Sequence, residues 1–134
     1  MKHFKNKKGI TLVEVIVVLI IMAVLSGILV ASYTGYIDKA NDDKALVEAR
    51  AVYLAASTYY NEAYAGVYAP TTPDVKVDGV AKLSEEDICT LAGFDHTKVT
   101  VGEITTENGK IKTMTYVATN GKTCTLSDTG WTVS

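Results

Sequence analysis

The sequence predicts an α+β protein in which one long N-terminal helix, transmembrane at first and amphipathic later, packs on a small antiparallel β-sheet. Three observations support this prediction. The chain starts with a long apolar segment, it continues with a helical repeat that no proline interrupts before Pro70, and its last third is rich in β-branched residues and hairpin turns. A chain of 134 residues is long enough for one domain and one additional element.

A basic leader precedes the apolar segment. Residues 1–9 contain four lysines and no acidic residue, whereas Ile10 to Ala31 contain Glu14 as their only charge. An apolar helix of this length spans the hydrocarbon core of a bilayer, which is about 30 Å thick. Because basic flanks stay on the cytoplasmic side, we expect residues 1–9 inside, residues 10–32 in the membrane and residues 33–134 outside.

The helical pattern continues beyond the membrane segment, with apolar residues on two faces. One stripe consists of Tyr33, Ile37, Ala40, Val47, Ala51 and Leu54, and the second consists of Ala45, Ala49, Val52, Ala56, Tyr59 and Ala63. We therefore expect one helix from about Ile10 to about Tyr64. A helix with two apolar faces needs two surfaces to cover them.

A loop and a short helix follow. Gly66 is expected to end the long helix, and the prolines of Ala69–Asp74 indicate a surface loop before a short extended piece at Val75–Val77. A helix is predicted over residues 84–92. Ser84 is its expected N-cap, Asp87 stands at the capping-box spacing, and Gly93 closes it.

The remaining sequence predicts an antiparallel sheet over about residues 99–133. Asn-Gly pairs at 108–109 and 120–121 are strong hairpin signals between runs of Val, Ile, Thr and Tyr. The predicted strands are Val99–Thr106, Lys110–Ala118 and Thr123–Leu126, with a last strand around Trp131–Val133.

The junction between leader and helix reads Lys-Lys-Gly-Ile-Thr-Leu-Val-Glu at residues 7–14, directly before an uninterrupted apolar run. This arrangement resembles the prepilin signal of type IV pilins, pseudopilins and competence pilins. The resemblance implies that a prepilin peptidase cuts between Gly9 and Ile10 and methylates the new amine of Ile10. It also implies a type IV pilin fold and self-assembly into a helical homopolymer by an assembly platform and its ATPase. Unlike many members, this chain has no proline in the apolar helix.

Glu14 is the residue that a plain membrane anchor explains least well. A carboxylate in an apolar segment costs several kcal/mol of desolvation unless it is paired or protonated, roughly 2–4 kcal/mol on insertion scales. The resemblance implies that Glu14 neutralises the amine of Ile10 in an adjacent subunit. Two alternatives are an ordinary signal anchor whose Glu14 reaches the headgroups, and a secretory signal cut near Val30-Ala31-Ser32.

The resemblance implies a structural subunit of a type IV pilus used for adhesion, motility or aggregation. The precursor would lie in the cytoplasmic membrane with its C-terminus outside, and the mature chain would lie in a surface filament. A pseudopilin of a type II secretion system, or a competence pilin for DNA uptake, shares the same N-terminal signal and is the alternative.

Two cysteines, Cys89 and Cys124, lie in the part expected to be exported, where oxidising conditions permit a disulfide. In the family that this chain resembles, a disulfide often fastens the C-terminal part of the head to the sheet. The alternative is two buried free thiols that behave as small apolar groups.

No enzyme, metal site or cofactor is expected. His96 stands alone, and the cysteines lack the paired spacing of metal ligands. The exported residues offer no pair of nucleophile and base. After loss of the leader, nine basic residues would face fifteen acidic ones, a formal charge of −6. Such a surface argues against nucleic-acid binding by the body of the subunit.

Overall fold

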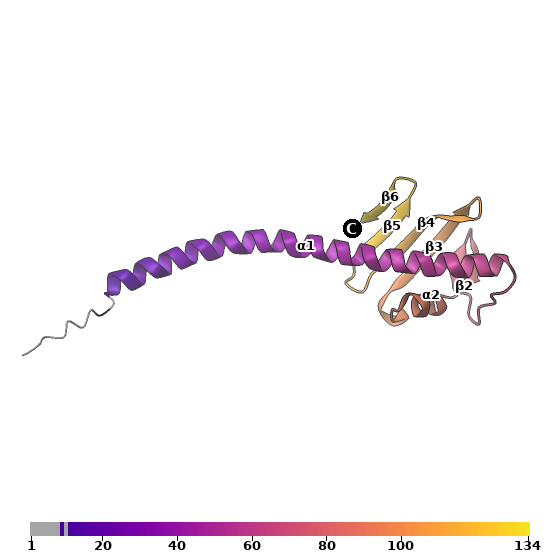
Figure 1. Ribbon diagram of the computed structural model, residues 1–134, viewed down its shortest axis with the longest axis horizontal. Helices are drawn as coiled ribbons and strands as arrows, with labels where there is room; N and C mark the ends of the chain where they lie inside the picture. Colours follow the sequence, from indigo (N-terminus) through magenta and orange to yellow (C-terminus); the bar gives the residue numbers. More distant parts are fainter. Residues whose placement is uncertain (1–8, 10) are drawn as a thin grey trace, which may run out of the picture. The chain divides into compact units, whose positions relative to one another are not determined.

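The computed structural model describes residue 9 and residues 11–134. Its elements are α1 (Leu12–Tyr64), β1 (Val75–Val77), β2 (Val80–Leu83), α2 (Glu85–Ala92), the 3₁₀ helix η1 (His96–Lys98), β3 (Thr100–Glu107), β4 (Lys110–Val117), β5 (Thr123–Ser127) and β6 (Gly130–Val133) (Figure 1). The chain divides into two compact units, Met1–Asp38 and Lys39–Ser134, and the boundary between them lies within α1. The second unit, called the head below, contains the sheet and the core.

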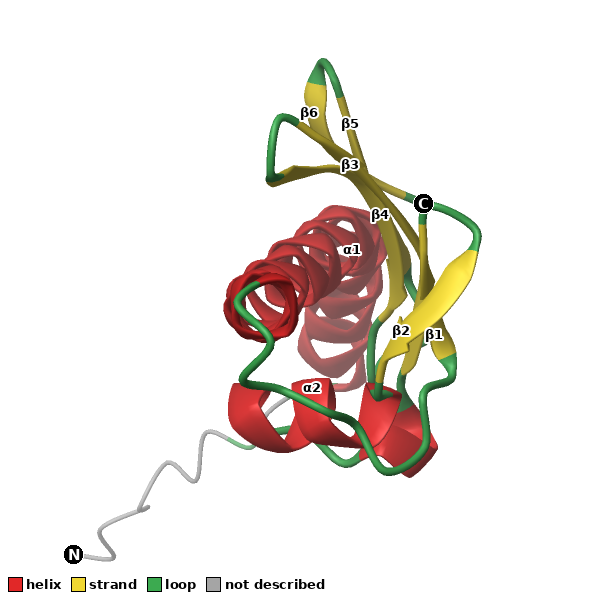
Figure 2. Cartoon of the chain, turned by 90° about the vertical axis from the view of Figure 1, so that its right-hand side faces the viewer, coloured by secondary structure: helices red, strands yellow, loops and turns green. Residues whose placement is uncertain are grey.

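The two apolar faces expected for the long helix are both present in the head. The stripe from Ala45 to Ala63 faces the core, and Ala45, Ala49, Val52 and Ala56 are all fully buried. Val47 and Leu54, which belong to the other stripe, are exposed. The small alanine side chains let α1 lie close along one face of the sheet (Figure 2). Within the head, the sheet therefore covers one apolar face of α1, and the other apolar face is exposed.

Both α-helices end as the glycines predicted. Gly66 and Gly93 have positive φ angles of 73° and 84°, which cost glycine little because it lacks a Cβ atom. The N–H of Val67 donates to the carbonyl of Glu62 at 2.9 Å, and the N–H of Phe94 donates to that of Cys89 at 2.8 Å. These bonds define Schellman motifs, which satisfy carbonyls that the helix itself leaves free. The helix start predicted at Ile10 lies outside the described residues, and α1 begins at Leu12.

The strands form a six-stranded sheet in the order β2-β1-β3-β4-β5-β6. The predicted meander from β3 to β6 is confirmed, and every pair within it is antiparallel. The prediction of a wholly antiparallel sheet was incomplete, because β1 pairs with β3 in parallel through Val77 and Ile104. The connection through α2 and η1 carries the chain back before β3 starts, which is what a parallel pair requires.

Strand β2 was not predicted from the sequence. Asp78 and Gly79 both have positive φ angles, 51° and 80°, as a tight type I′ hairpin requires. They join β1 to β2, and Val77 pairs with Val80 across the turn. An Asp-Gly pair is a hairpin signal, but the four residues after it alternate too little in hydrophobicity to predict a strand.

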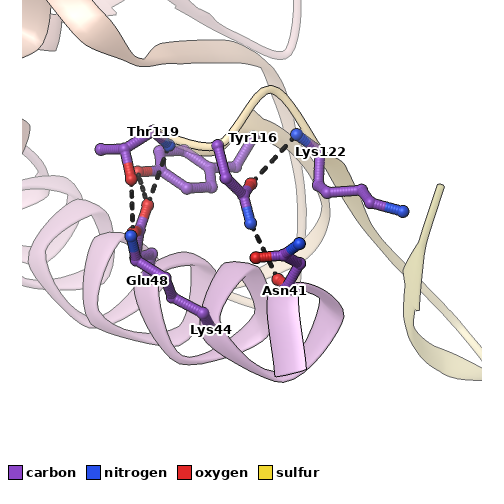
Figure 3. A network of polar contacts seen from close by, with 7 residues as sticks. Asn41, Lys44, Glu48, Tyr116, Thr119 and Lys122 are labelled. Atoms are coloured by element: carbon purple, nitrogen blue, oxygen red, sulfur yellow. Dashed lines mark hydrogen bonds and ion pairs between the residues drawn. The ribbon is translucent and has the colours of Figure 1, made fainter. Parts of the chain in front are cut away.

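Polar contacts fasten α1 to the loop between β4 and β5 (Figure 3). Glu48 is only 5% exposed. Its carboxylate accepts the Thr119 hydroxyl at 2.7 Å, the Thr119 N–H at 3.0 Å and the Tyr116 hydroxyl at 3.3 Å. Burial raises the pKa of Tyr116, and the adjacent Glu48 charge raises it further, so the phenol keeps the proton that it donates.

Two further contacts extend this fastening toward the start of the head. The side-chain amide of Asn120 donates to the Asn41 carbonyl at 2.8 Å, and the Lys122 ammonium lies 3.0 Å from an Asp42 carboxylate oxygen. Together with Glu48, these residues hold about two turns of α1 against one loop of the sheet. A buried carboxylate needs such partners because burying it without them is costly.

A first prediction concerns the N-cap of α2. Ser84 is 2% exposed, and its hydroxyl accepts the Asp87 N–H at 3.4 Å, as its spacing predicted. Ser84→Ala is expected to lower the free energy of unfolding by about 1 kcal/mol, because one orphan N–H loses its acceptor. Urea unfolding of the full chain in detergent, followed through Trp131 fluorescence, measures this change.

Ser57→Ala serves as the control for that prediction. The Ser57 hydroxyl donates to the Tyr53 carbonyl within the same helix, at 2.8 Å. Because that carbonyl is already used by the helix, removing the hydroxyl should change stability by less than about 0.5 kcal/mol. Equal losses in the two variants would contradict the capping role of Ser84.

Candidate processing and assembly site

The predicted cleavage junction lies immediately before the start of α1. Gly9 is exposed and belongs to neither helix nor strand. A Cβ atom added at Gly9 would meet no heavy atom within 4 Å. Ile10, the predicted new terminus and methylation site, lies outside the described residues. Gly9 is thus accessible, and two residues separate it from Leu12, the first residue of the helix.

Glu14 and Thr11 cap the helix reciprocally. The Glu14 carboxylate accepts the Thr11 N–H at 2.8 Å, and the Thr11 hydroxyl accepts the Glu14 N–H at 3.3 Å. This is a capping box, in which two orphan N–H groups of the first turn find acceptors. The carboxylate also lies at the positive end of the helix dipole, which favours its charge.

Sequence reasoning missed this contact, although the signal for it is present. Thr11-Leu12-Val13-Glu14 has the same spacing as the pattern that identified Ser84 as an N-cap. Glu14 therefore has a role within its own chain. Its predicted pairing with the amine of an adjacent Ile10 remains a prediction, and the two roles are compatible because a carboxylate accepts several hydrogen bonds.

An exposed apolar surface begins directly after Glu14. The described side chains of residues 15–30 carry no charge, and the large apolar ones among them, such as Leu19 and Leu25, are exposed. Length and composition make α1 long enough and apolar enough to cross a membrane. Leaving this surface in water would be costly, so it needs a bilayer or protein to cover it.

The two cysteines lie in the core of the head. Cys89 comes from α2 and Cys124 from β5, and both are fully buried. Burial raises the pKa of the Cys89 thiol to about 11, and it raises the pKa of Cys124 as well. Both are free cysteines in this structure. The predicted disulfide remains a prediction, and the raised pKa values disfavour the thiolate that exchange chemistry requires.

Two tyrosines of the head pack against other aromatic rings, and His96 lies at the surface. Tyr53 packs edge-on against Trp131, with ring centroids 6.3 Å apart, and Tyr59 packs against Tyr68 at 4.6 Å. His96 begins the 3₁₀ helix and is exposed. Within the part of the chain that the structure describes, no group of three His, Cys, Asp or Glu side chains is placed to hold a metal ion.

Comparison with known proteins finds the N-terminal signal. Residues 4–30 match the family model described as the prokaryotic N-terminal methylation motif. The match includes the Gly9–Ile10 junction, the Thr11–Glu14 capping box and most of the apolar segment. No curated protein and no solved structure was found to match the chain. The chain therefore carries the prepilin-type signal of type IV pilin-like proteins, ahead of a helix-and-sheet head that is consistent with a pilin fold.

Proposed function

We propose that this chain is a structural subunit of a type IV pilus, used for adhesion, motility or aggregation. The methylation motif at residues 4–30 is the observation that carries the proposal. The exposed apolar face that follows it supports the proposal, because a subunit that leaves the membrane needs other subunits to cover that face. We propose no catalytic role for the chain.

Processing gives the subunit its assembly-competent form. A prepilin peptidase removes residues 1–9 and methylates the amine of Ile10. The four lysines of the leader hold it in the cytoplasm, so the C-terminus of the precursor lies outside. An assembly platform and its ATPase then add mature subunits to a helical homopolymer at the cell surface.

The charge of Glu14 guides each subunit into place. The new Ile10 amine is a cation in apolar surroundings, and Glu14 of an adjacent subunit supplies the opposite charge. Because this amine exists only after cleavage, processing and polymerisation are coupled electrostatically. The capping contact with Thr11 supports this role, since it holds the carboxylate at the same end of the helix as the amine.

In the exported head we propose a disulfide between Cys89 and Cys124. Both thiols are buried, and both belong to the same core cluster of the head. A bond between them would close a loop of about 35 residues, which the chain-entropy model values at about 3–4 kcal/mol. Forming a disulfide from two thiols removes two hydrogen atoms, so an intact mass about 2 Da below that of the reduced chain would show the bond.

The test of the proposed function is the mass of the processed chain. The full chain is expressed in membranes with an active prepilin peptidase and with a catalytically inactive one. The expected product of the active enzyme lacks residues 1–9 and carries one methyl group at Ile10. A cut near Ser32, or no difference between the two enzymes, would overturn the proposal.

A second measurement separates a pilus subunit from a pseudopilin or a competence pilin. Cells that express the chain at its native level are sheared, and the released material is analysed by electron microscopy and mass spectrometry. A pilus subunit is expected to be the dominant protein of long fibres. Correct processing without such fibres would assign the chain to the alternative instead.

A further inference from the structure

The tripeptide Asn-Gly-Lys occurs twice in the head, at residues 108–110 and at residues 120–122. In each, the backbone nitrogen of the glycine can attack the side-chain carbonyl carbon of the asparagine, because glycine has no Cβ atom to obstruct the approach. The asparagine and the glycine are exposed in both tripeptides. Local sequence and exposure therefore do not distinguish the two sites, and a difference in reactivity must come from their contacts.

The fold holds the reacting groups of the second tripeptide. The side-chain amide of Asn120 donates to the Asn41 carbonyl at 2.8 Å, and its side-chain oxygen accepts the Lys122 N–H at 3.1 Å. The N–H of Gly121 donates to the Ala118 carbonyl at 2.9 Å. Attack at this site would therefore have to break three hydrogen bonds first.

The first tripeptide lies at the tip of the hairpin between β3 and β4, and its reacting groups are not held. Asn108 and Gly109 have φ angles of 53° and 77°, as a type I′ turn requires. Within the described residues, neither the Asn108 side chain nor the Gly109 N–H has a hydrogen-bond partner. The turn must rotate before the Gly109 nitrogen can reach the side-chain carbon, and an exposed loop tip opens at little cost in free energy.

We propose that Asn108 is a site of spontaneous modification, at which its side-chain amide is converted to the carboxylate of aspartate or isoaspartate. The Gly109 nitrogen forms a bond to the side-chain carbonyl carbon, and the amide nitrogen leaves as ammonia with the proton of the Gly109 N–H. Water then opens the resulting cyclic imide at either carbonyl. One opening gives aspartate, and the other routes the backbone through the side chain as isoaspartate. The reaction consumes only water.

The product places a carboxylate beside a hollow between α1 and the β3–β4 hairpin. This hollow has a volume of about 340 Å³, and its lining residues include Tyr53, Tyr60, Gly109 and Lys110. Lys110 is the only charged residue among those that line it. A carboxylate at Asn108 would partly offset that charge, since opposite charges at short range interact even at the surface. The inference goes beyond the proposed function and does not depend on it, because it uses only contacts within the head.

The experiment is an incubation of the full chain in detergent, in water labelled with heavy oxygen, followed by trypsin digestion and mass spectrometry. The label marks each carboxylate that forms during the incubation. Trypsin cuts after lysine, so residues 99–110 and residues 113–122 form separate peptides, each with one asparagine and no glutamine. The first peptide is expected to convert at least about tenfold faster than the second, because tenfold needs only about 1.4 kcal/mol. In urea, where the fold is lost, the two should convert at similar rates.

Asn108→Gln is the control variant. Its longer side chain would have to close a larger ring, so the labelled product of peptide 99–110 should disappear. Equal rates for the two peptides in the folded chain, or faster conversion at Asn120, would overturn the proposal. Conversion of peptide 99–110 only in urea, or a labelled product that persists in Asn108→Gln, would overturn it as well.

Discussion

Glu48→Ala is expected to lower the free energy of unfolding of the full chain by about 3–5 kcal/mol, the usual cost of breaking a buried charged network from one side. The variant removes three hydrogen bonds at once. It leaves the fully buried Tyr116 hydroxyl and the Thr119 N–H without their acceptor, and an unsatisfied buried donor costs about 1–3 kcal/mol. Urea unfolding in detergent measures the loss.

Trp131 provides the signal for this experiment. It is the one tryptophan of the chain, and it packs against Tyr53 of α1, so its fluorescence reports contact between helix and sheet. Lys44→Ala is the matched control. Lys44 is 61% exposed and lies 3.9 Å from Glu48, so its loss should cost no more than about 1 kcal/mol. Equal effects of the two substitutions would contradict the central role of Glu48.

Glu14→Ala is expected to be cut and methylated normally and yet to yield few filaments. The substitution removes the carboxylate that is proposed to neutralise the Ile10 amine of an adjacent subunit. An unpaired amine in apolar surroundings costs roughly 2–4 kcal/mol on insertion scales, which is enough to lower filament yield by more than about tenfold. Intact mass measures processing, and sheared filament yield measures assembly.

Glu14→Gln separates the two roles of this residue. Glutamine also suits the third helical position of a capping box, so it can keep the contact with Thr11 while it loses the charge. If charge pairing drives assembly, the glutamine variant should fail as the alanine variant does. Normal filaments from Glu14→Gln would show that capping is what matters, and normal filaments from both variants would refute any assembly role for Glu14.

Most of the elements could be predicted because local signals define them. The N-cap at Ser84, the Schellman glycines 66 and 93, and the Asn108-Gly109 turn each act within a few residues. The predicted strands therefore match the observed ones to within about one residue at most ends. The prepilin-type signal was equally predictable, because a basic leader, Gly9 and Glu14 stand in a fixed order along the chain.

The sequence by itself determined the prepilin-type signal, the long helix with two apolar faces, and the hairpins of the last third. Only the tertiary structure decided that β1 lies parallel to β3 and that Glu48 is buried beside Tyr116 and Thr119. The physical reason is the range of the interactions. Caps and turns act between residues a few positions apart, whereas these two features depend on residues that are 27 to 71 positions apart and meet only when the core closes.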